Sequence, residues 1–125
     1  MVLGERRIPG NLKPFAGSGY WCLSNNSAKL VHNFVKQNPR FYNFFKYVYV
    51  PDEIMFQTIL LNSQVAPNVI NGNLRCIDWS DEIYRPRVWR KHDIDTLGKS
   101  NGLIARKFDA TVDSEVLDVI DRELL

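Results

Sequence analysis

The chain has 125 residues, of which 45% are hydrophobic and 24% charged, a composition that fits one small globular domain or a piece of a larger one. It excludes disordered and fibrous chains, and no apolar run approaches the roughly 18 residues that a membrane span needs. The N-terminus has no apolar stretch of the kind found in signal peptides. Two cysteines cannot form a multi-bridge framework, so Cys22 and Cys76 are expected to be half-buried thiols, with a single bridge between them as the alternative.

The net charge of +2 is unevenly distributed along the chain. Residues 1–50 contain seven Lys and Arg and one acidic residue, whereas residues 51–125 contain nine Lys and Arg and thirteen Asp and Glu. The basic part favours an anionic partner, but two differently solvated faces of one fold explain the same division more simply.

The first half of the chain predicts mainly helices. Residues 1–16 contain prolines and glycines without a clear period and predict an entering loop. Residues 19–23 are rich in aromatic side chains and predict a short buried strand. Residues 28–37 place apolar side chains on one stripe, which predicts an amphipathic helix, and residues 24–27 supply several candidate N-caps.

Two further helices are expected before residue 62. Phe41, Phe44 and Phe45 share one helical face and predict a short second helix over residues 40–46. Pro51 and the acidic pair after it favour the first turn of a third helix. That helix is apolar on almost every side, which predicts that it is buried all round.

The second half of the chain alternates short strands and helices. Strands are predicted over residues 74–79 and 103–105, with a polar and basic loop over residues 80–91 and a short helix over residues 93–97. Asp113 or Ser114 is expected to cap a last helix. Its apolar stripe comprises Val116, Leu117, Ile120 and Leu124. The fold class predicted from this order is α/β, with short strands and packed helices.

Glu53 is the first candidate for chemistry. Burial at the mouth of an apolar helix favours its neutral form, whereas the helix N-terminus favours its charged form, and the two influences together describe a poised general base. The simpler interpretation is a carboxylate that complements the helix dipole.

Arg106 and Lys107 are the second candidate, because two adjacent cations where a strand ends can bind a diphosphate. Solvated surface charges are the simpler interpretation. Trp79, at the end of the other predicted strand, is suited to stack on a sugar face, and a core tryptophan is the alternative.

A metal site is not expected. Asp93 and Asp95 form an Asp-x-Asp tripeptide, but it is short and falls in a predicted surface helix. His32 and His92 have no partner at the spacing of metal ligands. The basic stretch over residues 85–91 is weak support for contact with nucleic acid.

Four blocks of sequence, taken in order, resemble one enzyme family. They are GSGYWCLS at residues 17–24, VPDEIMFQTILLNS at 50–63, NLRCIDW at 73–79 and ARKFD at 105–109. Together they are similar to motifs of the core-2/I-branching β-1,6-N-acetylglucosaminyltransferases and the related peptide O-xylosyltransferases. Gly19 departs from the pattern, since it replaces a larger and usually polar residue.

The resemblance implies a fold and a domain organisation. Residues 1–125 are expected to form the C-terminal portion of a GT-A type fold, the acceptor-side and catalytic-base part of a glycosyltransferase domain, with residues 1–16 as the entering loop. The family's N-terminal nucleotide-binding half has no counterpart in this sequence. On this interpretation the chain is a fragment that is catalytic only with its missing half.

The resemblance also implies roles for particular residues. It assigns the catalytic base to Glu53 and the donor diphosphate to Arg106 and Lys107, which replace a divalent metal, so no metal cofactor is expected. It places Gly17, Ser18, Asp52 and Trp79 on the acceptor side. Arg85 or Arg87 is a candidate for a second phosphate-binding arginine.

The function expected is inverting transfer of GlcNAc or xylose from a UDP-sugar to a hydroxyl of a glycan or protein. A non-catalytic carbohydrate-binding or interaction module that keeps the acceptor-side surface is the alternative. A nucleic-acid-binding domain that stacks bases on Tyr42, Tyr47 and Tyr49 is the weakest interpretation, and nucleic acid is not expected as a partner. The chain is expected on the cytoplasmic side, with membrane association through other parts, or in the Golgi lumen for a eukaryotic member.

Overall fold

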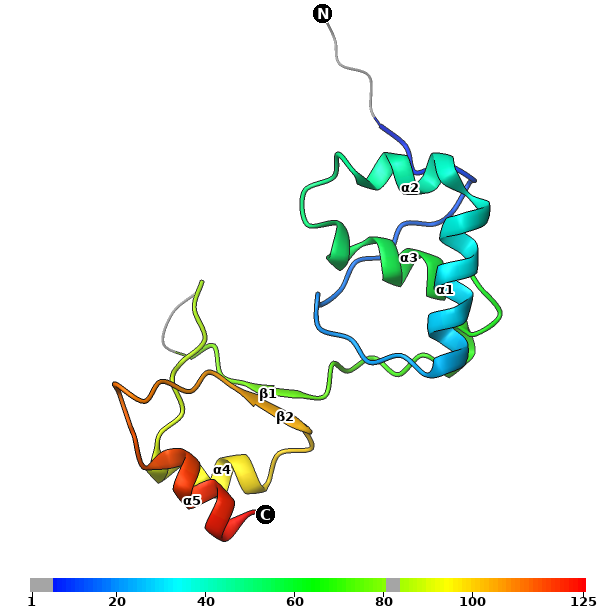
Figure 1. Ribbon diagram of the computed structural model, residues 1–125. Coiled ribbons are helices and arrows are strands. Elements are labelled where there is room, and N and C mark those ends of the chain that lie inside the picture. The colour runs from blue at the N-terminus through cyan, green and yellow to red at the C-terminus, as the bar shows by residue number, and fades with distance from the viewer. Residues whose placement is uncertain (1–5, 81–83) are drawn as a thin grey trace, which may run out of the picture. The chain divides into compact units, whose positions relative to one another are not determined.

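The computed structural model describes residues 6–80 and 84–125 and consists of two compact units, Met1–Gly72 and Asn73–Leu125. The first unit is helical and the second combines helices with a small sheet (Figure 1). None of the helices within residues 6–80 and 84–125 has both the length and the apolar character that crossing a membrane requires.

Three α-helices build the first unit: α1 (Asn25–Gln37), α2 (Pro39–Phe45) and α3 (Met55–Leu61). The hydroxyl of Ser24 accepts a hydrogen bond from the Ser27 amide and caps α1, as its sequence predicts. Pro39 lies in the first turn of α2, where its missing N–H is not needed, so a separate helix starts there. The three helices pack together (Figure 1) around a core of Val31, Phe41, Phe45, Ile59 and Leu60.

The predicted strand over residues 19–23 is wrong. This segment is irregular, and Tyr20, Trp21 and Cys22 are exposed. A strand needs a neighbouring strand to pair with, and residues 6–72 contain none. Trp21 instead packs against the Phe56 ring of α3, with ring centroids 4.2 Å apart.

The predicted third helix is divided in two. Pro51–Glu53 forms a 3₁₀ turn, and α3 begins only at Met55, after Ile54 interrupts the helical geometry. Burial on every side is also wrong, because only Thr58, Ile59 and Leu60 of α3 are buried.

The second unit contains strands β1 (Arg75–Ile77) and β2 (Ile104–Arg106), which pair in parallel with Cys76 opposite Ala105. Parallel strands need a long crossover, and here it includes a 3₁₀ turn (Lys91–Asp93) and α4 (Ile94–Gly98). This strand–helix–strand order agrees with the predicted α/β class. The predicted strand over 74–79 is shorter in the structure, and Trp79 lies beyond its end.

The chain closes with α5 (Val116–Glu123), which lies beside α4 (Figure 1). The Asp113 carboxylate accepts hydrogen bonds from the amides of Glu115 and Val116, so Asp113 caps this helix as predicted. Val116 is buried, but Leu117 and Leu124 of the predicted stripe are exposed. The buried face of α5 is therefore narrower than its pattern indicates.

Candidate functional site

Glu53 ends the 3₁₀ turn that precedes α3, and its side chain is exposed, as is that of Asp52. The sequence predicted a buried carboxylate at the mouth of a helix. The predicted burial of Glu53 is wrong. The helix starts two residues later, at Met55, and the turn that carries Glu53 lies at the surface.

The backbone that carries this turn is held in an unusual conformation. Val50 has φ 50° and ψ 59°, in the left-handed region. A β-branched residue rarely adopts it, and a residue before proline is biased to extended geometry. The amide of Glu53 donates to the carbonyl oxygen of Val50 at 3.1 Å and closes the turn. Such strained residues persist only where the surrounding structure fixes them, and they cluster at functional sites.

The predicted acceptor-side residues of the first unit lie together with Glu53. The amide of Gly17 donates to the carbonyl oxygen of Glu53 at 2.8 Å, and the next residue, Ser18, is held by the Gln57 amide group at 2.9 Å. A Cβ at Gly19 would lie 2.6 Å from the Asp52 Oδ2. The structure thus brings Gly17, Ser18, Asp52 and Glu53 to one place.

Polar side chains of α3 and of Asn62, the residue after it, hold the segment that carries Gly17 and Ser18. The Asn62 side chain exchanges two hydrogen bonds with the backbone of Lys13, and the Thr58 hydroxyl exchanges two with the backbone of Phe15. The apolar pattern of residues 54–61 predicted a helix buried by apolar contacts and did not indicate these hydrogen bonds. The signal was present, since Gln57, Thr58 and Asn62 interrupt an otherwise apolar run.

In the second unit, Arg106 is the last residue of β2 and Lys107 follows it, so the strand ends at the predicted pair. Arg106 is half-buried and Lys107 is exposed, and the peptide bond between them is cis. Trp89, only 2% exposed, donates its indole N–H to the Arg106 carbonyl oxygen at 2.7 Å and its backbone N–H to that of Lys107 at 2.9 Å. A residue from the predicted basic loop therefore anchors this pair, and no local pattern indicated this contact.

Arg87 is engaged by two carboxylates. Its guanidinium binds Asp93 through two bonds at 2.9 and 3.0 Å and Asp78 through one at 2.8 Å, and it lies over the Trp89 ring. These bonds, with those from Ser80, lower the pKa of the Asp78 carboxyl to about 2, and Arg87 also lowers the pKa of Asp93. The same hydrogen bonds, those that Arg87 donates to Asp93 foremost, raise the pKa of Arg87. Arg87 thus acts as a structural clamp between two carboxylates, and the assignment of Arg85 or Arg87 as a second phosphate-binding arginine stays a prediction.

The remaining predicted residues are also placed. Trp79 is 55% exposed, so the alternative of a core tryptophan is wrong. Of the Asp-x-Asp pair, Asp93 is bound by Arg87, and within residues 6–80 and 84–125 no group of His, Cys, Asp and Glu gathers at metal-binding geometry. Cys76 is half-buried as predicted, whereas Cys22 is exposed.

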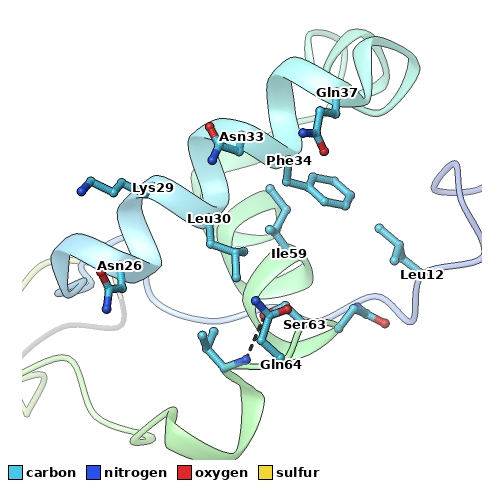
Figure 2. A pocket seen from close by; sticks show the side chains of 12 residues that line it. Leu12, Asn26, Lys29, Leu30, Asn33, Phe34, Gln37, Ile59, Ser63 and Gln64 are labelled. Carbon is cyan, nitrogen blue, oxygen red and sulfur yellow. Dashed lines mark hydrogen bonds between the residues drawn. The ribbon is translucent and has the colours of Figure 1, made fainter.

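An open groove of about 730 Å³ lies along α1 and α3 in the first unit (Figure 2). Its floor is apolar, with Leu30 and Phe34 of α1 facing Ile59 of α3, and side-chain amides such as Asn33 and Gln37 line its rim. None of the predicted site residues lines it, so the groove is separate from the turn that carries Glu53.

Comparison with known proteins gives a family and distant relatives. The model of a family described as Core-2/I-Branching enzyme matches residues 2–99. The chain is 29% identical to Xylosyltransferase 2 of Rattus norvegicus and of Homo sapiens, over 98% of its own length. It is 27% identical to Xylosyltransferase 1 of Rattus norvegicus, again over 98% of its length.

The two comparisons cover different parts of the chain. The family match includes the turn with Glu53 and reaches Trp79, but it ends before Arg106 and Lys107. The similarity to the xylosyltransferases spans 98% of the chain. The chain in turn covers only 16% of the length of Xylosyltransferase 2 and 17% of that of Xylosyltransferase 1.

Proposed function

The chain belongs to the core-2/I-branching enzyme family. We propose that it functions as part of an inverting glycosyltransferase, which transfers GlcNAc or xylose from a UDP-sugar to a hydroxyl group of a glycan or protein. The observation that carries this proposal is the family match across residues 2–99, which contains Glu53 and the residues that surround it. The fold that goes with this activity is the C-terminal, acceptor-side portion of a GT-A type domain.

Glu53 is the proposed general base. Its exposed carboxylate takes the proton of the acceptor hydroxyl as that oxygen forms a bond to the anomeric carbon of the donor. The bond from the anomeric carbon to the diphosphate oxygen breaks at the same time, and UDP leaves with the electron pair. Attack from the face opposite to the leaving group inverts the anomeric centre.

Arg106 and Lys107 are proposed to neutralise the charge that develops on the leaving diphosphate. Guanidinium and ammonium groups suit this role, the first through paired hydrogen bonds and the second as a point charge. The anchoring of both carbonyl oxygens by Trp89 supports it, because a fixed backbone holds the two cations where charge develops. With these cations in place, we propose that transfer does not depend on a divalent metal.

The acceptor is proposed to bind beside Glu53, at Gly17, Ser18 and Asp52. An acceptor-binding role is proposed separately for Trp79. The proximity of the first three residues to Glu53 supports this assignment. The exposed indole of Trp79 offers an apolar face for a sugar ring and an N–H donor.

The names of the relatives favour xylose over GlcNAc as the donor sugar. Those relatives are mammalian proteins. This favours the Golgi lumen, the compartment expected for a eukaryotic member, over the cytoplasmic side of a membrane.

The test is a transfer assay with UDP-xylose and UDP-GlcNAc, in the presence and absence of EDTA, on the protein that carries this chain. We expect Glu53→Gln to lower kcat by about 10²- to 10⁴-fold, the usual effect of removing a general base. Asp52→Asn is the matched control, since it removes a neighbouring carboxylate of the same turn and is expected to raise the acceptor KM instead. Acceptor binding without transfer from either donor would favour the non-catalytic carbohydrate-binding module.

A further inference from the structure

We propose that Thr58, assisted by Gln57 and Asn62, is a positioning residue for the acceptor side of the site. Its hydroxyl makes the backbone hydrogen bonds that a neighbouring strand would otherwise make, and these bonds hold residues 13–18 in position beside Glu53. The inference rests on the proposed function, because the segment matters to catalysis only if Glu53 acts there as the base.

The hydrogen bonds follow the pattern of a strand edge. Bonded backbone groups recur at alternate residues, Lys13, Phe15 and Gly17, as they do along a strand within a sheet. The partner at the first position is the side chain of Asn62, which follows α3, and at the second it is the side chain of Thr58 within α3. The carbonyl oxygen of Glu53 is the partner at the third. The side chains of Thr58 and Asn62 thus supply the hydrogen-bond partners that a second strand would otherwise supply.

Thr58 is the central contact of this ladder. It is fully buried, at 0% exposure, although it is polar. Its hydroxyl oxygen accepts from the Phe15 amide at 3.1 Å, and its proton is donated to the Phe15 carbonyl oxygen at 3.2 Å. Loss of this one hydroxyl therefore leaves two backbone groups of the segment without their partner.

The segment has little freedom to shift without disturbing the turn. Gly17, two residues after Phe15, bonds the Glu53 carbonyl oxygen at 2.8 Å. A Cβ at Gly17 would lie 3.3 Å from the Gln57 Cγ, so there is little room for a side chain at this position. Displacement at Phe15 is therefore transmitted to Gly17 and to the turn that ends in Glu53.

Gln57 supplies a second, independent observation. Its Nε2 donates to the Ser18 carbonyl oxygen at 2.9 Å, while its Oε1 is buried and has no hydrogen-bond partner among the described residues. A buried acceptor without a partner is unfavourable. Its presence is explained if the donor half of the same amide is required to hold Ser18.

The experiment compares Thr58→Val, which keeps the shape and loses the hydroxyl, with Thr58→Ser, which keeps the hydroxyl and loses a methyl group. Ile59→Val, a buried truncation on the same helix, controls for a general loss of stability. Two readouts are measured on the protein that carries this chain: amide hydrogen exchange at Phe15 and Gly17, and steady-state transfer with acceptor and donor varied separately.

We expect Thr58→Val to accelerate exchange at Phe15 and Gly17 by about tenfold and to lower kcat by about 10- to 100-fold, because misplacement of a catalytic group by about 1 Å has effects of this size. The donor KM is expected to stay unchanged, and Thr58→Ser and Ile59→Val are expected to resemble the parent protein in both readouts. Equal behaviour of the valine and serine variants at position 58 would overturn the inference. If the parent protein transfers no sugar, the proposed function fails, and the exchange rates at Phe15 and Gly17 then decide alone whether Thr58 holds the segment.

Discussion

The indole N–H of Trp89 donates to the carbonyl oxygen of Arg106 at 2.7 Å, and this bond connects the loop before α4 with the end of β2. The backbone N–H of Trp89 makes a parallel contact with the Lys107 carbonyl oxygen. A single buried residue, through its side chain and its backbone, thus anchors the backbone of the two residues that the proposed mechanism assigns to the diphosphate.

Trp89→Phe is expected to weaken UDP binding without unfolding the second unit. The phenyl ring keeps most of the apolar contact but lacks the N–H, so the Arg106 carbonyl oxygen loses its partner, at a cost of about 1–3 kcal/mol. Calorimetric titration with UDP and a thermal melt measure the two effects. Trp79→Phe is the control, because Trp79 is exposed and its replacement is expected to leave Tm unchanged.

Lys107→Ala and Arg106→Ala are expected to lower UDP affinity by about tenfold or more each, since a hydrogen bond to a charged group contributes about 1.5–3 kcal/mol. EDTA is expected to have no effect on binding by the parent protein. Calorimetric titration with UDP, in the presence and absence of EDTA, measures both properties. Lys99→Ala, an exposed lysine of the same unit, serves as the control. Affinity that is retained in the Lys107 variant would remove the diphosphate role from this residue.

The Arg87 clamp is expected to make the stability of the second unit depend on acidic pH. The pKa of Asp78 falls from 3.8 to about 2 in the folded chain, and that of Asp93 is also lowered, through their bonds to Arg87. Carboxyls whose pKa is depressed by folding stabilise the folded state above their unfolded pKa, and this contribution is lost as the pH falls towards the folded pKa. Stability is therefore expected to decrease between about pH 4 and pH 2.

Arg87→Met tests this expectation, because it removes the guanidinium and keeps an unbranched side chain against the Trp89 ring. The variant is expected to melt at a lower temperature than the parent protein at neutral pH. The difference between the two is expected to shrink as the pH falls from about 4 to about 2, where the carboxylates become protonated. A constant difference across this range would contradict the assigned role of the clamp.

Gly19→Ala is expected to alter acceptor kinetics while leaving the fold intact. The added Cβ would meet the Asp52 Oδ2 at 2.6 Å, and the carboxylate, as the end of a side chain, can rotate away. Acceptor KM is expected to rise with donor KM unchanged. Gly72→Ala is the matched control, since a Cβ there meets nothing within 4 Å. Parent-like acceptor kinetics would separate Asp52 from the acceptor site.

The parts of the fold that depend on local signals were predictable. The stripe of α1 and its Ser24 cap are written in consecutive residues, as is the Asp113 cap of α5. The strand predicted over residues 19–23 was not, because pairing depends on a partner that the local sequence does not contain.

The candidate site was likewise predictable only where local sequence encodes it. The block that contains Glu53 was identifiable by resemblance, but the contact between Gly17 and Glu53 joins residues 36 positions apart, and nothing local encodes it. Trp89 was missed for the same reason. It lies in a polar and basic stretch, and only its distant partners make it a core residue.

The two sides of the hydrogen-bond ladder beside α3, the segment over residues 13–17 and the side chains that bind it, are expected to differ in their tolerance to mutation. Its bonds reach the backbone of Lys13 and Phe15 and not their side chains, so the hydrogen bonds at position 13 survive replacement by any amino acid other than proline. On the helix, by contrast, a single exchange at Thr58 removes two bonds at once. We therefore expect variation within the family to concentrate at position 13 of the segment and to be restricted at position 58 of the helix.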